Sequence, residues 1–136
     1  MIEVVARIPT AEEYLTLREA VGWKVPRPDD CDRALSSTID AAVAEHDGEP
    51  VAMGRTVGDG VFYSFVVDLV VRPEHQGLGL GSRLLAALAQ AAALRSTTGL
   101  IQLVAEDHLG RFYERNGFLR DSDGLYSMRL RPAAAG

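Results

Sequence analysis

The sequence of 136 residues lacks several features that define whole classes of protein. It has one cysteine, Cys31, so no disulfide can form within the chain, and a metal site built on paired cysteines is excluded. Its single lysine, Lys24, and its scattered arginines form no basic stripe, which argues against a nucleic-acid partner. No apolar run approaches the roughly 20 residues of a membrane helix, so no membrane partner is expected. The three histidines are scattered and indicate no metal site: His46, His75 and His108.

What the chain does contain fits one folded domain. Its hydrophobic content of 47% can fill a core, and its length is typical of a single domain. We expect this domain to span residues 1–131, followed by a frayed tail at 132–136. A lone cysteine fits a reducing compartment, and the first residues are acidic where a signal peptide would be apolar. A cytoplasmic location is therefore predicted.

Two helices are predicted near the N-terminus, after a short strand at residues 2–8. Thr10, with Glu13 three residues later, has the spacing of a capping box, in which each side chain satisfies the other residue's backbone N–H. A helix should therefore begin after Thr10 and end at Gly22. A second helix should begin at Pro28, because acidic residues follow this proline in what would be the first turn.

Three consecutive strands are predicted to follow as an antiparallel meander. The turns between them are expected at Asp47–Gly48 and Asp59–Gly60, since an Asp-Gly pair between two strand-like runs favours a hairpin. The third strand, 61–71, is apolar at both alternations, which is typical of a central strand covered on both faces. Residues 100–104 follow a helix and are a candidate parallel neighbour of this third strand.

The remaining elements complete an α/β fold. A helix is expected over 82–95, a short helix after a cap at Asp107, and a closing hairpin over 118–131 around Asp123–Gly124. The predicted order is β-α-α-β-β-β-α-β-α-β-β. This order gives a mixed, mostly antiparallel central sheet flanked by helices.

The stretch VVDLVVRPEHQGLGLGSRLL, residues 66–85, places three glycines between a buried strand and a helix. The first N–H groups of a helix have no internal partner, and glycine lets such groups converge on an anion. A tight turn would need one glycine, so Gly77, Gly79 and Gly81 together favour an anion site. Ser82 is then expected to start the helix, with Leu78 and Leu80 facing the core.

Three phosphate ligands can be compared with this glycine pattern. A P-loop is rejected, because it requires a lysine that is absent here. A dinucleotide fingerprint starting at Gly77 would need glycine where Ser82 stands, and it normally follows the first strand of a parallel sheet. A dinucleotide-dependent enzyme, with Glu106 as the acid on the ribose, remains an alternative. The third ligand is the pyrophosphate of coenzyme A.

Two segments resemble the GNAT superfamily of acyl-CoA-dependent N-acyltransferases. Gln76, Gly79 and Gly81 match the acyl-CoA motif of Gln or Arg, two residues, Gly, one residue, and Gly or Ala. The preceding V-x-P-x-x-Q pattern is also typical of the family. The segment RFYERNGF, at 111–118, is similar to the family's F-Y-E-x-x-G-F. The element order also matches from about residue 3 to residue 131.

The resemblance implies that acetyl-CoA is the co-substrate, and the scattered histidines give no reason to expect a metal beside it. The pyrophosphate would lie on backbone N–H groups of the glycine turn, and the pantetheine arm would run beside the end of the central strand. Asn116 is either a further coenzyme contact or only a helix stop before Gly117. The implied coenzyme contacts are Leu69, Val70, Val71, Gln76, Gly77, Leu78, Gly79, Leu80, Gly81, Ser82 and Asn116.

The implied reaction is the transfer of an acetyl group to a primary amine by direct attack in a ternary complex. Tyr113 is the candidate acid that protonates the leaving thiolate. Without the family motif, the expected role of Tyr113 would be to pack its ring against neighbours of its helix. Asp68 is the only charge in its strand. It is either a base or amine anchor, or a structural partner of a loop or an arginine. The N–H of Leu69 or Val70 is the implied oxyanion donor.

The acceptor pocket is implied to lie between the N-terminal helices and the final hairpin. Its candidate residues are Tyr14, Arg18, Trp23, Tyr63 and Ser64, with the loop through Pro28. The acceptor can be a small-molecule amine or a peptide amine, and the acyl group can be acetyl or longer. Dimerisation is common in the family, so a homodimer is one expectation. The alternative function is a non-catalytic acyl-CoA-binding or sensor module.

Overall fold

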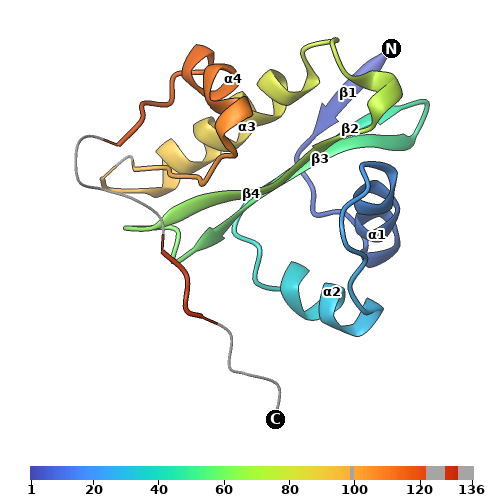
Figure 1. Cartoon of the computed structure of the whole chain (residues 1–136), viewed down its shortest axis with the longest axis horizontal. Helices are drawn as coiled ribbons and strands as arrows, with labels where there is room; N and C mark the ends of the chain where they lie inside the picture. The colour runs from blue at the N-terminus through green and yellow to red at the C-terminus, as the bar shows by residue number, and fades with distance from the viewer. Residues whose placement is uncertain (99, 122–127, 132–136) are drawn as a thin grey trace. The chain divides into compact units, whose positions relative to one another are not determined.

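The computed structural model describes residues 1–98, 100–121 and 128–131 (Figure 1). The chain forms two compact units, Met1–Leu103 and Val104–Gly136. The first unit begins β-α-α-β-β-β-α, which confirms the predicted order for these seven elements. Among the described residues, no helix combines the length and the apolar character needed to cross a membrane.

A four-stranded antiparallel sheet forms the centre of the first unit, in the order β1-β2-β3-β4. The strands are β1 (Ile2–Val5), β2 (Ala41–His46), β3 (Glu49–Gly58) and β4 (Ser64–Val71). The fold is therefore the predicted α/β class, with a mostly antiparallel sheet.

The predicted parallel neighbour of β4 is confirmed at a single bridge. Phe65 and Gln102 pair in parallel. The Gln102 N–H donates to the Ser64 carbonyl at 2.9 Å, and the Val66 N–H donates to the Gln102 carbonyl at 2.8 Å. The bridge lies near the start of β4, and the strand continues beyond it to Val71.

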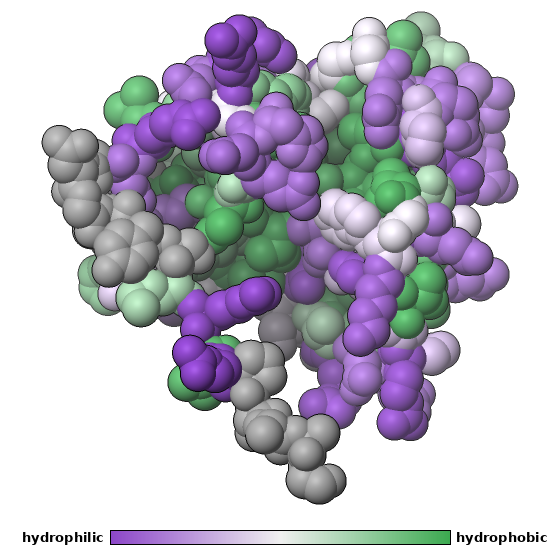
Figure 2. Space-filling view, in the orientation of Figure 1, coloured by the Kyte–Doolittle hydropathy of each residue, from purple (hydrophilic) through white to green (hydrophobic). Residues whose placement is uncertain are grey.

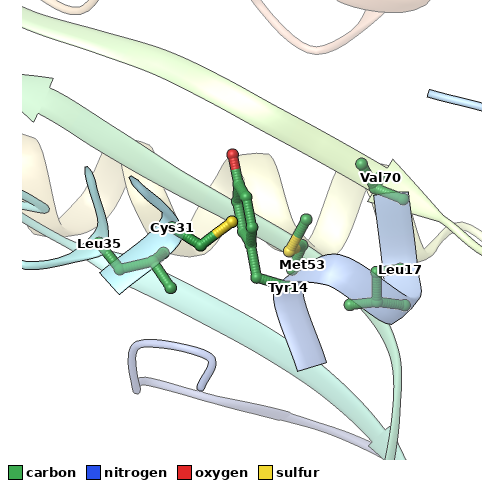
Figure 3. Close-up of a cluster of buried hydrophobic side chains, with 6 residues drawn as sticks. All are labelled: Tyr14, Leu17, Cys31, Leu35, Met53 and Val70. Atoms are coloured by element: carbon green, nitrogen blue, oxygen red, sulfur yellow. The ribbon is translucent and has the colours of Figure 1, made fainter. Parts of the chain in front are cut away.

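Helices cover both faces of the sheet (Figure 1). The helices α1 (Ala11–Ala20) and α2 (Pro28–Leu35) lie on one face, and α3 (Leu80–Arg95) lies on the other. The first face buries a cluster in which the Tyr14 ring lies between Cys31 and Met53 (Figure 3). The other face packs Leu80 and Leu84 of α3 on small residues of the strands. The first cluster comprises Tyr14, Leu17, Cys31, Leu35, Met53 and Val70.

The capping box at the start of α1 is confirmed. The Glu13 N–H donates to the Thr10 hydroxyl at 3.1 Å, and the Thr10 N–H donates to a Glu13 carboxylate oxygen at 2.9 Å. We expect Thr10→Ala to lower the free energy of unfolding by about 1 kcal/mol, because an N–H at the helix start loses its acceptor. Urea denaturation checks this loss. The exposed mid-helix variant Thr16→Ala is the control and should stay within about 0.5 kcal/mol of wild type; equal losses would contradict the role of the cap.

The turn predicted at Asp47–Gly48 between the first two strands of the meander is confirmed, and the one predicted at Asp59–Gly60 is part of a longer loop. Asp47 and Gly48 have φ of 51° and 80°, the conformation of a two-residue hairpin turn. Gly58 pairs with Ser64 instead, so residues 59–63 form a loop and β4 begins at Ser64, not at residue 61. The Asp59 carboxylate accepts hydrogen bonds from three successive N–H groups of this loop, which lowers its pKa and replaces strand pairing there.

The second unit contains a 3-10 turn, η2 (Asp107–Leu109), and a short helix, α4 (Gly110–Arg115). The predicted cap at Asp107 is wrong, because this residue lies inside the 3-10 turn and the residue before α4, Leu109, makes no side-chain cap. The predicted stop at Asn116 and Gly117 is confirmed, with Gly117 at φ 91°. Residues 118–121 and 128–131 are the described parts of the predicted closing hairpin and carry no strand. Its turn at Asp123–Gly124 and the tail 132–136 lie outside the described residues.

Candidate functional site

The glycine turn between β4 and α3 has the backbone that an anion site requires. Gly77 and Gly79 have φ of 81° and 77°, the left-handed region that side chains rarely adopt. A Cβ placed on either would meet no atom within 4 Å, so the space above the turn is open. Gly81 lies within α3 and has no such φ. Two of the three glycines are therefore required by the conformation of the turn.

The N–H groups of this turn are free to bind a ligand. None of the described residues accepts a hydrogen bond from the six consecutive backbone N–H groups of Gly77–Ser82. The next N–H, of Arg83, donates to the Gly79 carbonyl at 3.1 Å and begins the helical pattern. We call residues 77–82 the N–H cradle. Because the helix dipole is positive at this end, the N–H cradle suits a phosphate group.

Three details of the cradle differ from the sequence-based expectation. The helix begins at Leu80 with Gly79 as its N-cap, so Ser82 does not start it. Leu80 is buried, as expected, but Leu78 is 60% exposed and does not face the core. A left-handed residue on each side of Leu78 turns its side chain outward. The Gln76 side-chain amide donates to the Val71 carbonyl at 3.1 Å, which ties the cradle to the end of β4.

A β-bulge interrupts β4 at Asp68. Met53 pairs with Val70 and Arg55 pairs with Val67, so two residues of β4 lie opposite Gly54. Asp68 has φ of 55°, a left-handed conformation that aspartate tolerates better than most residues. The extra residue changes the face of the sheet to which each following side chain of β4 points. Leu69 and Val71 therefore pack with the α3 face, while Val70 packs with the face of α1 and α2.

The Asp68 carboxylate is bound by three side chains. It accepts a hydrogen bond from Arg55 Nε at 2.8 Å, from the Tyr14 hydroxyl at 2.8 Å and from Arg18 Nη1 at 3.2 Å. Its side chain is 12% exposed, and both arginine contacts are ion pairs. We call Tyr14, Arg18, Arg55 and Asp68 the arginine cluster. Each carboxylate oxygen already accepts from an arginine, so this geometry supports the structural alternative for Asp68, and its role as a base stays a prediction.

Tyr14 joins the arginine cluster to the core. Its ring is buried, while its hydroxyl points out of the apolar cluster (Figure 3). Burial, followed by the hydrogen bond to Asp68, raises the pKa of Tyr14 above its ordinary value. The hydroxyl is thus held as a donor to Asp68, and it also accepts from Arg18 Nη1 at 3.3 Å.

The other predicted acceptor residues are spread over the first unit. Trp23 is 41% exposed, and the Arg18 guanidinium carbon lies 5.4 Å from its ring centroid. Tyr63 lies in the loop before β4, not on the strand, and is 57% exposed. Ser64 is the first residue of β4 and is buried. On the viewed face of the molecule, apolar surface alternates with polar surface (Figure 2). Of these residues, Trp23 lies beside the arginine cluster, because its ring is in contact with Arg18. A substrate-binding role for any of them stays a prediction.

Arg55 is the residue of this site that the sequence does not reveal. It lies in β3, is 8% exposed, and also donates through Nη1 to the Ala34 carbonyl and the Thr38 hydroxyl. It thereby connects the end of α2 to the bulge. A buried arginine inside a strand is the only signal that could have found it, since burial of arginine requires a partner.

In the second unit, the Tyr113 ring packs edge-to-face on Phe112 and Phe118, with centroids 5.1 and 5.9 Å apart. Its hydroxyl donates to no described residue, and burial raises the pKa of Tyr113. The hydroxyl therefore stays protonated at neutral pH. The Asn116 amide donates to the Phe112 carbonyl at 2.8 Å, which fits a helix stop; its coenzyme contact stays a prediction.

No group of three or more metal-ligating side chains occurs among residues 1–98, 100–121 and 128–131. Together, a mostly antiparallel sheet, a bulged strand and an N–H cradle at a helix start define an α/β protein with a candidate anion site at the strand-to-helix junction. This combination fits the pyrophosphate of an acyl coenzyme, because the cradle offers donors and no competing carboxylate hydrogen-bonds to it among the described residues.

The chain belongs to the GNAT acetyltransferase family, since the family described as acetyltransferase (GNAT) domain matches residues 38–120. A curated relative, the uncharacterized N-acetyltransferase ycf52 of Pyropia yezoensis, is 34% identical over 121 residues, which are 85% of this chain and 68% of the relative. Serotonin N-acetyltransferase 2, chloroplastic, of Oryza sativa subsp. japonica is 44% identical over 82 residues, or 60% of this chain. The chain spans 40% of the length of this rice protein, and also 40% of the length of a curated Arabidopsis thaliana relative.

Solved structures share the fold. A GNAT-family acetyltransferase from Streptococcus pneumoniae TIGR4 is 29% identical, with a TM-score of 0.78 over 96% of this chain and 100% of that chain. A probable acetyltransferase from methicillin-resistant Staphylococcus aureus has a TM-score of 0.86 over 97% of this chain and all of that one. At 23% identity, the second structure shows likeness of fold alone.

Proposed function

We propose that this protein transfers an acetyl group from acetyl-CoA to a primary amine in a ternary complex. The observation that carries the proposal is the N–H cradle, whose six N–H groups donate to no described residue at the positive end of α3. Family membership supplies the reaction class. The cradle would hold the pyrophosphate, and the edge of β4 at Leu69–Val71 would hold the pantetheine arm.

In the proposed reaction, the amine nitrogen bonds to the thioester carbonyl carbon, and the carbon–sulfur bond breaks. The chain binds both substrates, which supplies the positioning that speeds such a reaction. Tyr113 Oη gives its proton to the departing thiolate, and the attacking amine loses a proton to water or to a base. The assignment of Tyr113 rests on the family-like segment 111–118 and on its protonated hydroxyl, which has no hydrogen-bond partner among the described residues.

We expect Tyr113→Phe to lower kcat by about 100-fold or more, since this is the lower range for removal of a general acid. The ring contacts on Phe112 and Phe118 remain in this variant, so coenzyme binding should stay at the wild-type level. Because the protonated phenol is the active form, the fall in wild-type rate on the alkaline side should begin above the raised pKa of Tyr113, while protonation of the acceptor amine lowers the rate at low pH. A kcat–pH profile of both proteins checks this; an unchanged kcat in the variant rejects the acid role.

Release of free thiol from acetyl-CoA across a panel of primary amines tests the proposed function. The expected result is amine-dependent release that saturates with one class of amine. Tight coenzyme binding without thiol release from any amine would instead support a non-catalytic acyl-CoA-binding module. Stabilisation by NAD and not by acetyl-CoA would overturn both and support the dinucleotide alternative.

Location and assembly are proposals as well. We propose a cytoplasmic protein on the basis of its lone cysteine, although the rice and Arabidopsis thaliana relatives are named as chloroplastic. A homodimer is proposed because dimers are common in the family. Analytical ultracentrifugation of the purified chain tests this proposal.

A further inference from the structure

The arginine cluster carries more positive than negative charge. Arg18 and Arg55 both pair with Asp68, so two guanidinium groups share one carboxylate. Within the described part of the chain, neither arginine forms an ion pair with a second carboxylate. Among the described residues, one positive charge is therefore left without a carboxylate partner, and the two arginine side chains are only 17% and 10% exposed. A charge held so far from water is costly unless an anion joins it.

Both arginines also retain an unused donor. Arg18 uses Nε for the Lys24 carbonyl and Nη1 for Asp68 and the Tyr14 hydroxyl. Arg55 uses Nε for Asp68 and Nη1 for groups at the end of α2. No described residue accepts from Nη2 of either one. The chain thus holds the two guanidinium planes by their other nitrogens and leaves Nη2 of each available.

The more exposed arginine lies between two aromatic rings. The Arg18 guanidinium carbon is 5.5 Å from the Tyr14 ring centroid and 5.4 Å from that of Trp23. Trp23 is 41% exposed, so this end of the cluster reaches solvent. An arginine fixed by aromatic rings and a carbonyl loses little side-chain entropy when it binds an anion. Of the two arginines, Arg18 has the more accessible side chain, 17% against 10%, so it is the first contact for a ligand.

We propose that the arginine cluster binds an anionic group, a carboxylate or a phosphate, on the amine that the enzyme acetylates, with Arg18 as the specificity-determining residue. This inference rests on the proposed function and names the class of its acceptor. The acceptor is a small amine with an anionic group at its other end. Asp68 acts here as the counterion that holds both arginines, and the bulge places it between them.

The test compares matched amines in the thiol-release assay. The pairs are 4-aminobutyrate and phenylalanine against their primary amides, and glucosamine 6-phosphate against glucosamine. We expect kcat/KM to be at least about 10-fold higher for the anionic member of one pair, since a hydrogen bond to a charged group contributes about 1.5–3 kcal/mol. The pair that shows the preference distinguishes a carboxylate from a phosphate. Equal kcat/KM within every pair overturns the proposal.

Arg18→Met keeps the length and the apolar stem over Trp23 but removes the charge. The ratio of kcat/KM between anionic and neutral amine should fall to about one in this variant, as a lost charge-assisted hydrogen bond predicts. Arg18→Lys should restore part of the ratio. The control is Arg33→Met, because Arg33 is 83% exposed in α2 and should leave the ratio unchanged. Weaker binding of coenzyme A by Arg18→Met would assign the cluster to the coenzyme and overturn the proposal.

A binding experiment separates this proposal from the proposed function. Trp23 is the only tryptophan of the chain and lies against Arg18, so its fluorescence reports directly on the cluster. Titration of wild type with the same pairs should change the emission at lower concentrations of the anionic member, with or without turnover. If no amine releases thiol but this preference is present, the proposed function fails alone. If thiol is released but no pair shows a preference in either assay, the anion site fails alone.

Discussion

Asp68→Ala is expected to lower the free energy of unfolding by about 3–5 kcal/mol, the loss typical of removing one partner from a buried ion pair. The variant leaves Arg18 and Arg55 as buried cations whose ion-pair partner is gone. It also places alanine at φ 55°, which adds about 1 kcal/mol because alanine tolerates the left-handed region poorly. Urea denaturation of the variant and wild type measures the sum.

Two further variants separate the charge from the backbone strain. Asp68→Asn keeps a residue that tolerates φ 55° and keeps a hydrogen-bond acceptor, so it should lose less stability than alanine. Tyr14→Phe removes only the neutral donor and should cost about 1 kcal/mol. An alanine variant within about 0.5 kcal/mol of wild type would contradict the structural role of Asp68. A folded Asp68→Asn protein with wild-type kcat would reject its role as a base.

Gly79→Ala is expected to raise the Kd for acetyl-CoA by about 10- to 100-fold, which corresponds to losing one charge-assisted hydrogen bond. Gly79 has φ of 77° and is the N-cap of α3, so a residue that avoids this φ turns the neighbouring N–H groups away from the cradle. The added Cβ would also stand in the open space that the ligand would occupy. Isothermal titration calorimetry with acetyl-CoA measures the change.

Gly22→Ala is the matched control for this change. Gly22 has φ of 76° and open space around its Cα, but it ends α1 and is not part of the cradle. Both variants should therefore lose about 1–2 kcal/mol of stability from backbone strain. Only Gly79→Ala should weaken coenzyme binding. Equal weakening in both variants, or none in either, would contradict the assignment of the cradle.

Some local signals in the sequence predict local structure correctly, while the cap at Asp107 and the tight turn at Asp59–Gly60 are wrong. The capping box of Thr10 and Glu13 and the turn at Asp47–Gly48 are both confirmed, because each depends on residues close in the chain. The glycine turn was likewise recognised from its spacing. Its details were not, since the outward direction of Leu78 follows from the two left-handed residues that flank it.

The features that depend on distant residues were harder to predict. Leu69 and Val71 pack with the α3 face and Val70 with α1 and α2, because the bulge at Asp68 adds one residue to the strand. The sequence marked Asp68 as unusual but left its partner open between a loop and an arginine. Its partners, Arg18 and Arg55, come from α1 and β3, and no local pattern connects these positions.

The central claim is that the N–H cradle binds the pyrophosphate of acetyl-CoA. The most direct measurement is calorimetric titration of the wild-type chain with acetyl-CoA and, separately, with S-acetylpantetheine, which has the same thioester arm but no pyrophosphate. The account predicts that acetyl-CoA binds at least about 100-fold more tightly, because several charge-assisted hydrogen bonds of about 1.5–3 kcal/mol each are lost with the pyrophosphate. Equal affinity for the two ligands, or no binding of acetyl-CoA, would contradict it.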